Sequence, residues 1–413
     1  MAFERVEGRL ACDGVPLDAI AAAAGTPVHV YSAATILERY RALDAAFASY
    51  PHRLHYAIKA NATLGLVRLM RELGASADAN SGGEIEVALR AGFTPADIVF
   101  TGVGKTAAEL DRAVGLRLGA INVESPGEMD RIASRAKTQG IRTRVAVRIN
   151  PDVDAGSHPH ISTGRLDTKF GMSVDDAASL IRTMAANADL HVVGLHVHVG
   201  SQVTTTGPLV RAATVISDLA RTLAADGIPL EHLDLGGGLG LAYEPGQPAL
   251  RVEEYAEAIL PAIRAAGLML LLEPGRWIVG PAGVLVAEVV DIKPKPTGGL
   301  FVIVDAGLTD LLRPALYGAW HSIEPIAPRP GAQAETDIVG PVCETSDTLG
   351  RDRSLPPVRV GDLLAIRDTG AYGAVMASNY NRRPLASEVL VRDGQWRVIR
   401  RRQTVDEMLQ WDQ

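Results

Sequence analysis

The stretch His55-Tyr56-Ala57-Ile58-Lys59-Ala60-Asn61 joins a short buried strand, expected over residues 54–58, to a lysine at its carboxyl end. Ammonium groups are rarely buried without a partner, so two interpretations of Lys59 are open. It is either a surface lysine whose stem runs past the strand, or an amine held in a pocket. In a pocket its pKa would be lowered, and it could form a Schiff base with a carbonyl. The residues that end the other strands decide between these interpretations.

Strands of this kind recur from Ser32 onward, each followed by a longer amphipathic segment. Eight alternations of strand and helix over about 240 residues are typical of a (β/α)8 TIM-type barrel. A doubly wound open sheet would show the same local pattern, and periodicity alone does not separate the two folds. The predicted strands span residues 54–58, 75–79, 98–101, 120–123, 144–149, 192–199, 232–235 and 269–272.

After residue 280 the pattern changes to short β-rich runs separated by proline and glycine. These runs predict a second, mostly antiparallel domain, a C-terminal β-sandwich or β-barrel. We therefore expect a barrel domain over residues 32–283 and a β domain formed by residues 1–31 and 284–413.

The composition is that of a globular protein, with 47% hydrophobic and 22% charged residues. A net charge of -7 and the lack of a basic run argue against nucleic-acid binding. No apolar run approaches the ~18 residues that span a bilayer, so no membrane association is expected. The N-terminal residues lack the plan of a signal peptide. Cys12 and Cys343 are too few for a disulfide framework, which predicts a cytoplasmic location.

Polar and glycine residues directly follow several predicted strands, and in a barrel these positions meet at one face. Three consecutive glycines let backbone N–H groups approach an anion, although a triplet alone also fits a tight turn. With a glycine and an arginine after the eighth strand, the triplet predicts a phosphate site. The groups at this face are Lys59, Asp78, His198, Gly236, Gly237, Gly238, Glu273, Gly275 and Arg276.

A phosphate site, a reactive lysine and a carboxylate together suggest pyridoxal 5'-phosphate (PLP). Glu273 would pair with the pyridine nitrogen of this cofactor, or else it is an ordinary acid paired with Arg276. His198 could stack on the ring. A zinc site built from His196 and His198 is the competing interpretation, but neighbouring cysteines and acids are missing. No metal is therefore expected.

With these features in place, the sequence resembles the diaminopimelate decarboxylases, PLP enzymes of the alanine-racemase-like class called fold type III. The resemblance runs nearly end to end, and many short motifs occur in the same order. They include Tyr56-Ala57-Ile58-Lys59-Ala60-Asn61, Ser81-Gly82-Gly83-Glu84, His198-Val199-Gly200-Ser201-Gln202, Leu235-Gly236-Gly237-Gly238, Glu273-Pro274-Gly275-Arg276, Gly340-Pro341-Val342-Cys343-Glu344 and Gly370-Ala371-Tyr372.

The resemblance implies cofactor roles for residues along the barrel domain and for Tyr372 in the β domain. Lys59 would carry PLP, His198 would stack on its ring, and Glu273 would pair with its nitrogen. Asp78, Gly275 and Arg276 would belong to the same cofactor site. The phosphate would be held by Ser201, Gly236, Gly237, Gly238 and Tyr372.

The resemblance also implies a substrate site. Arg276, Arg313 and Tyr317, with Tyr372 nearby, would grip a distal carboxylate, and arginine suits bidentate capture of such a group. Glu344 would meet a distal ammonium, and Cys343 would serve in protonation at Cα. In this family the last two residues reach the pocket of the partner subunit, which implies a homodimer with shared active sites. Taken singly, Arg313 also fits a surface ion pair, and Cys343 a small buried apolar residue.

The expected activity is decarboxylation of meso-2,6-diaminopimelate to L-lysine and CO2, the last step of lysine biosynthesis. The alternatives are a related decarboxylase acting on a siderophore or antibiotic precursor, a non-catalytic PLP-binding protein, and a racemase. Residues 152–171 are long for a loop and contain Asp154, His158, His160, Ser162 and Lys169. We expect this loop to close over the site and keep water out.

Overall fold

The computed structural model describes residues 3–153, 168–296 and 298–412. Contacts divide the chain into two compact units. The barrel unit consists of Tyr40–Leu241 and Pro248–Gly275, and the β unit of Met1–Arg39, Ala242–Gln247 and Arg276–Gln413. The expected domain boundaries stay a prediction. Among the described helices, none is both long and apolar enough to cross a membrane.

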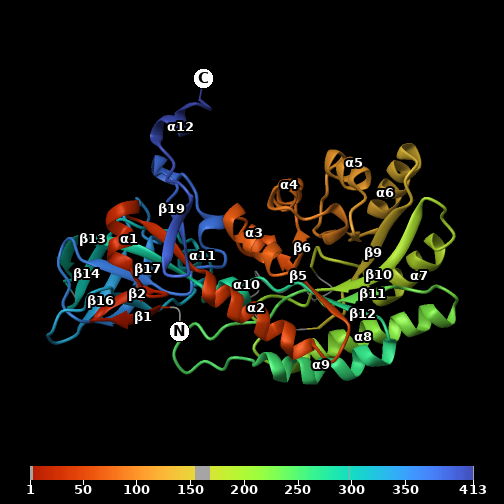
Figure 1. The fold of residues 1–413 in the computed structure, drawn as a ribbon, viewed down its shortest axis with the longest axis horizontal. Helices are drawn as coiled ribbons and strands as arrows, with labels where there is room; N and C mark the ends of the chain where they lie inside the picture. Colours follow the sequence, from red (N-terminus) through yellow and green to blue (C-terminus); the bar gives the residue numbers. More distant parts are fainter. Residues whose placement is uncertain (1–2, 154–167, 297, 413) are drawn as a thin grey trace. The chain divides into compact units, whose positions relative to one another are not determined.

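Eight parallel strands close into a barrel, which confirms the predicted fold and removes the open-sheet alternative (Figure 1). Neighbouring strands follow the chain order, and the last strand, β12, pairs with the first, β5, to close the ring. The strands are β5 (His52–Ala57), β6 (Ser76–Ala79), β7 (Ile98–Phe100), β8 (Ala120–Val123), β9 (Thr143–Ile149), β10 (Leu190–Val197), β11 (His232–Asp234) and β12 (Met269–Leu272).

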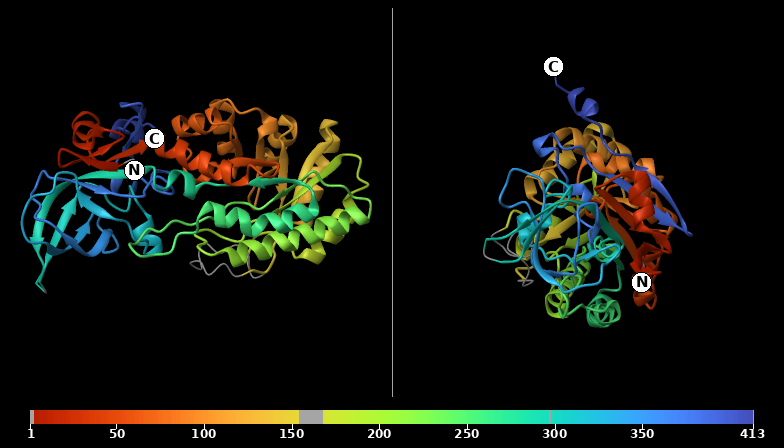
Figure 2. Two further views of the ribbon diagram at one scale, coloured as in Figure 1. Left: turned by 60° about the horizontal axis from the view of Figure 1, so that its bottom comes forward. Right: turned by 90° about the vertical axis from the view of Figure 1, so that its left-hand side faces the viewer.

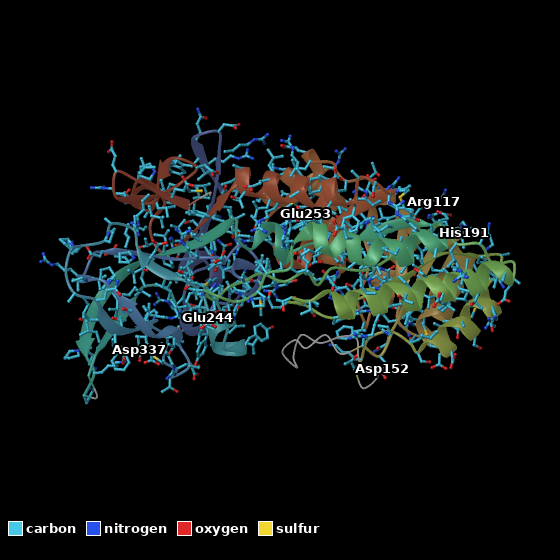
Figure 3. The ribbon with its side chains drawn as sticks, turned by 90° about the horizontal axis from the view of Figure 1, so that it is seen from below. Arg117, Asp152, His191, Glu244, Glu253 and Asp337 are labelled. Atoms are coloured by element: carbon cyan, nitrogen blue, oxygen red, sulfur yellow. The ribbon has the colours of Figure 1, made fainter. Side chains whose placement is uncertain are left out.

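Helix α2 precedes the first barrel strand, and further helices follow the strands and surround them (Figure 2, left). Their ends carry the expected signals: Thr106 and Glu109 form a capping box, and Gly92 and Gly140 end helices in the left-handed conformation. Seen from below, α9, which carries Glu253, runs beside α8 (Figure 3). The helices are α2 (Ala33–Phe47), α3 (Leu64–Glu72), α4 (Gly82–Ala91), α5 (Ala107–Leu116), α6 (Pro126–Gln139), α7 (Val174–Met184), α8 (Thr206–Ala225) and α9 (Val252–Ala266).

The β unit is built on a mixed sheet of nine strands. Its centre is the long strand β13 (Gly283–Pro294), which pairs antiparallel with β4 (Val28–Ser32). The N-terminal strand β4 thus belongs to the same sheet as the C-terminal strands. The remaining strands are β14 (Leu300–Val304), β15 (Ile323–Pro325), β16 (Ala334–Val339), β17 (Thr348–Leu355), β18 (Leu363–Ile366), β19 (Ser387–Arg392) and β20 (Gln395–Arg400).

Smaller elements complete the β unit. A three-stranded sheet precedes β4, and one short helix, α11, connects two strands of the large sheet. Apolar side chains on both faces of β13 are fully buried, including Val284, Leu285 and Val286. The small elements are β1 (Phe3–Val6), β2 (Arg9–Cys12), β3 (Val15–Pro16), α1 (Leu17–Ala24), α10 (Arg276–Val279), α11 (Arg313–Tyr317) and α12 (Val405–Leu409).

Candidate active site

Lys59 lies immediately past β5, in the 3₁₀ turn Ile58–Ala60, where the sequence places it. Its Nζ is 3.0 Å from Oδ2 of Asp78, a fully buried carboxylate on β6, and 3.2 Å from Oδ1 of Asn80. The amide of Asn80 also donates to Asp78, at 3.0 Å. The lysine is therefore held by neighbours at the strand ends, unlike a surface lysine that points into solvent.

Glu273 follows β12 and is fully buried beside His196, with 3.4 Å between Nε2 and Oε2. Burial alone would raise the pKa of Glu273, but His196, Lys59 and His198 lower it below its usual value. An ionised carboxylate at this position can accept a hydrogen bond from a protonated pyridine nitrogen. The alternative pairing of Glu273 with Arg276 is not needed to explain the burial of this acid.

Two further buried carboxyls surround this acid, and their pKa values move the other way. Burial, with the negative charge of Glu273, raises the pKa of Asp234 well above its usual value. The same two causes raise the pKa of Asp78, which Lys59 partly offsets. Like charges this close cannot all ionise, so the negative charge concentrates on Glu273.

The loops after β10, β11 and β12 contact one another closely. A Cβ on Gly237 would lie 2.3 Å from the carbonyl oxygen of Glu273, so only glycine fits there. Gly237 N donates to Nδ1 of His198 at 3.2 Å, which places the proton of this imidazole on Nε2. Burial and the positive charges of Lys59 and Arg148 hold the pKa of His198 well below its usual value. His198 is therefore a neutral ring beside the glycine turn.

These loops fit the phosphate and ring of PLP. The backbone N–H groups of Gly238 and Gly275 find no hydrogen-bond partner among the residues that the structure describes. Free N–H groups in glycine turns are suited to a phosphate, and such turns after strands seven and eight are its usual place in barrels. Ser201 is partly buried after β10, in the neighbouring loop. A Cβ on Gly275 would meet Ala60 Cβ at 2.8 Å, so this turn packs against the turn of Lys59.

The structure brings three possible metal ligands together in the barrel interior. The ligand atoms of His196, Asp234 and Glu273 lie within 4.8 Å of one another, and all three residues are buried. The competing interpretation from the sequence was a zinc site formed by His196 and His198. In the structure these two histidines have different environments. His196 contacts Glu273, whereas His198 contacts Gly237.

In the β unit, Arg276 and Arg313 gather around aromatic side chains. Arg276 Nη1 donates to the hydroxyl of Tyr243 at 2.9 Å, and its guanidinium stacks 4.7 Å from the ring centre of Tyr372. Arg313 lies over the other aromatic ring, 4.4 Å from the centre of Tyr243. Tyr317 ends the short helix that begins at Arg313. Two buried guanidinium groups around the ring of Tyr243 are suited to binding an anion.

A neutral histidine orients Arg313. His321 Nδ1 is 2.7 Å from the carbonyl oxygen of Arg367, so it must donate, and Nε2 then accepts from Arg313 Nη1 at 2.8 Å. Burial and the charge of Arg313 lower the pKa of His321 to about 3. Nε of Arg313 is buried without a partner in the described structure, which leaves a donor for a bound carboxylate.

Cys343 and Glu344 lie on an exposed loop of the β unit. The loop is anchored by the buried Asp347, whose carboxylate accepts from Leu308 N at 2.6 Å and Val342 N at 2.7 Å. Glu344 accepts from the hydroxyl of Tyr380 at 2.8 Å. Cys343 is thus an exposed thiol on a fixed loop, and the buried apolar interpretation of this residue is wrong.

Sequence reasoning missed Tyr243, His321 and Asn80 as members of these clusters. The short segment 242–247 belongs to the β unit although barrel residues flank it on both sides, and no periodicity marks it. Of the expected lid, Asp154, His158, His160 and Ser162 lie outside the described residues.

Comparisons with known proteins agree with this geometry. Residues 33–280 match the family model for the pyridoxal-binding domain of pyridoxal-dependent decarboxylases. A diaminopimelate decarboxylase of Vibrio cholerae is 45% identical over 406 residues, which cover 97% of this chain and 96% of the relative.

Two solved structures are similar over nearly the whole chain. The diaminopimelate decarboxylase of Helicobacter pylori, complexed with L-lysine, has a TM-score of 0.92 and 39% identity, covering 95% of this chain and 98% of its own. The enzyme of M. jannaschii, in co-complex with L-lysine, has a TM-score of 0.95 and 36% identity, covering 100% of this chain and 98% of its own. The chain belongs to the diaminopimelate decarboxylase family of pyridoxal-dependent enzymes.

Proposed function

We propose that this protein decarboxylates meso-2,6-diaminopimelate to L-lysine and CO2 with PLP as cofactor, as the last step of lysine biosynthesis. The observation that carries the proposal is the pairing of Lys59 with Asp78 at the same barrel face as the ionised Glu273. Relatives named for this activity, two of them solved with L-lysine bound, support it.

The barrel unit would hold the cofactor. PLP, when bound, supplies an electron sink for the charge left at Cα as CO2 departs. Lys59 would hold the aldehyde carbon, and Gly236, Gly237, Gly238, Gly275 and Ser201 would hold the phosphate. His198, a neutral imidazole, would cover one ring face, and Glu273 would keep the ring nitrogen protonated.

The β unit would supply the groups that select the substrate. Arg276 and Arg313, with the hydroxyls of Tyr317 and Tyr372, would bind a carboxylate that does not react. The stacking of both guanidinium groups on aromatic rings sets their planes before substrate arrives, which reduces the ordering that binding requires. A second carboxylate distinguishes diaminopimelate from ornithine and lysine, which have none at the distal end.

We also propose that the active form is a homodimer with shared sites. Cys343 and Glu344 are exposed on the isolated chain although an acid and a thiol are needed near the substrate. In a dimer, Glu344 of one subunit would meet the distal ammonium in the other, and Cys343 would deliver the proton to Cα. Both cysteines are free thiols, which accords with the proposed cytoplasmic location.

The test is an assay of purified protein with PLP and meso-diaminopimelate, following CO2 and L-lysine together. Lysine, ornithine and arginine serve as rival substrates. We expect equal amounts of CO2 and L-lysine from diaminopimelate and little CO2 from the rivals. Turnover of a rival at the same rate would contradict the assigned substrate, and racemised substrate without CO2 would contradict decarboxylation.

A further inference from the structure

The barrel has a hollow at the end opposite Lys59, where its strands begin. Arg117 and His191 mark this end in Figure 3. The interior of such a barrel is normally filled by bulky branched side chains. Here the small residue Ala120 lines a cavity of about 360 Å³, and the next two strands carry Ala146 and Gly194. This volume lies in the range of small-molecule sites.

Two histidines line the hollow without partners. His55 on β5 and His232 on β11 are 4% and 8% exposed. Nδ1 of His55 and Nε2 of His232 are buried and make no hydrogen bond to any residue of the described chain. These two nitrogens are enclosed, and Nε2 of His232 faces Gly194. Neither imidazole has a hydrogen-bond partner in the described structure, so the ring atoms that line the hollow are available to a ligand.

The histidines are neutral donors or acceptors and not cations. Burial lowers the pKa of His55 to about 4 and that of His232 to about 3. His232 is seated against Gly194, where a Cβ would lie 2.4 Å from the imidazole. The position of this ring is therefore set by the strand beside it.

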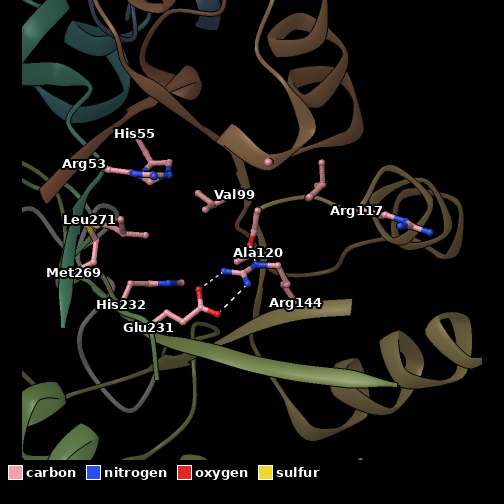
Figure 4. Close-up of a pocket in the computed structure, with 13 residues that line it drawn as sticks. Arg53, His55, Val99, Arg117, Ala120, Arg144, Glu231, His232, Met269 and Leu271 are labelled. Carbon is pink, nitrogen blue, oxygen red and sulfur yellow. Dashed lines mark hydrogen bonds and ion pairs between the residues drawn. The ribbon is translucent and has the colours of Figure 1, made fainter. Parts of the chain in front are cut away.

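The charge at the hollow is positive. Arg53 precedes His55 by two residues, so both side chains point to the same side of β5 (Figure 4). Arg53 forms no hydrogen bond or ion pair with a described residue. Arg144 is held in a bidentate pair by Glu231, at 2.6 and 3.0 Å, and also donates to the carbonyl of Gly119 at 2.8 Å.

The remaining walls are apolar. Val99, Met269 and Leu271 line the hollow between the two histidines (Figure 4), while the guanidinium of Arg117 points away from it. A free guanidinium beside neutral N–H donors favours an anionic headgroup, and the apolar wall favours a hydrocarbon body.

We propose that this hollow, formed by Arg53, His55, Val99, Arg144, His232 and Leu271, is a second ligand site for a small aliphatic carboxylate. The carboxylate pairs with Arg53 and accepts from an imidazole, and its carbon chain lies against Val99 and Leu271. The site is separate from the one that holds the substrate, because it lies at the amino ends of the strands and Lys59 at their carboxyl ends.

Calorimetric titration of the PLP-loaded enzyme tests the proposal. Glutarate, butyrate and inorganic phosphate are titrated separately, with L-lysine present at saturation to occupy the substrate site. We expect one glutarate or butyrate per chain, with a Kd of about 1 mM or tighter. The Arg53→Met variant should weaken this binding about tenfold, because it keeps the stem and removes the charge.

The matched control is Arg211→Met, which removes an exposed arginine on α8 away from the hollow. It should bind the carboxylates as the unmodified enzyme does. The proposal is overturned if no carboxylate binds at concentrations up to about 20 mM, if only phosphate binds, or if Arg53→Met binds unchanged. Binding that Arg313→Ala weakens as much as Arg53→Met does would assign the carboxylates to the substrate site and overturn it too. Loss of the proposed decarboxylase activity would leave this outcome unaffected, since the readout is heat of binding.

Discussion

The amine of Lys59 lies 3.0 Å from Oδ2 of Asp78, and this carboxylate is fully buried. A buried acid that meets a lysine at the end of a neighbouring strand keeps the amine in one place before the cofactor arrives. Asn80 contacts both groups, so the three side chains form one hydrogen-bonded set.

Lys59→Ala should abolish turnover and the visible absorbance band of the bound cofactor, because no other described amine lies at this strand end. Absorbance spectroscopy and the CO2 assay measure the two effects. Lys137→Ala, at an exposed position on α6, is the control and should change neither. Turnover retained by Lys59→Ala would remove the lysine from the centre of the mechanism.

Glu273→Gln should retain the cofactor band and reduce kcat about a hundredfold or more, because a neutral amide cannot keep the ring nitrogen protonated. Glu253→Gln, on the exposed first turn of α9, serves as the matched control. A variant with normal kcat would show that the charge of Glu273 is not used.

Arg313→Ala should raise KM for diaminopimelate about ten- to a hundredfold with a smaller effect on kcat, because the arginine binds a carboxylate that does not react. Steady-state kinetics separate the two constants. Arg382→Ala removes an exposed arginine of the β unit and should leave both unchanged. An unaltered KM in Arg313→Ala would exclude this residue from the substrate site.

Mixing the Lys59→Ala and Cys343→Ala variants should restore activity if the sites are shared between subunits. Each variant alone is expected to be inactive, and in a mixed dimer one site receives both intact residues. At equal amounts, about a quarter of the unmodified activity is expected after subunit exchange. Mixtures as inactive as the separate variants, although exchange is shown by native mass spectrometry, would place both residues in one subunit's site.

His29 predicts an acid-dependent loss of stability. Both ring nitrogens are buried without a partner in the described structure, and burial lowers the pKa of His29 to about 3. As pH falls below 6.5, the unfolded chain binds a proton that the folded chain excludes. This group alone therefore removes about 1.4 kcal/mol of unfolding free energy per pH unit, until the folded pKa is reached.

His29→Leu should be less sensitive to acid than the unmodified protein, by about 2 kcal/mol between pH 7 and pH 5. Urea denaturation at the two pH values measures the difference. Equal losses of stability in both proteins would show that His29 titrates normally in the folded state.

The barrel strands and the groups at their ends could be predicted because local patterns report them. The predicted spans 120–123 and 269–272 agree with β8 and β12 at both ends. Parallel strands place their carboxyl ends on one face, so Lys59, His198 and Glu273 could be assigned to one site without coordinates. In contrast, no local pattern reveals β17, because Arg351, Asp352 and Arg353 interrupt its apolar residues.

The sequence by itself determined the alternation of strands and helices, the cofactor-binding face and the family, since periodicity and ordered motifs are properties of the chain. Only the tertiary structure decided that the sheet closes, that Tyr243 and His321 orient two arginines, and that a hollow remains beside His55 and His232. The reason is that a pattern of apolar residues shows which side of a strand is buried. It does not show which strand lies beside it, or how completely the buried side chains fill the space between them.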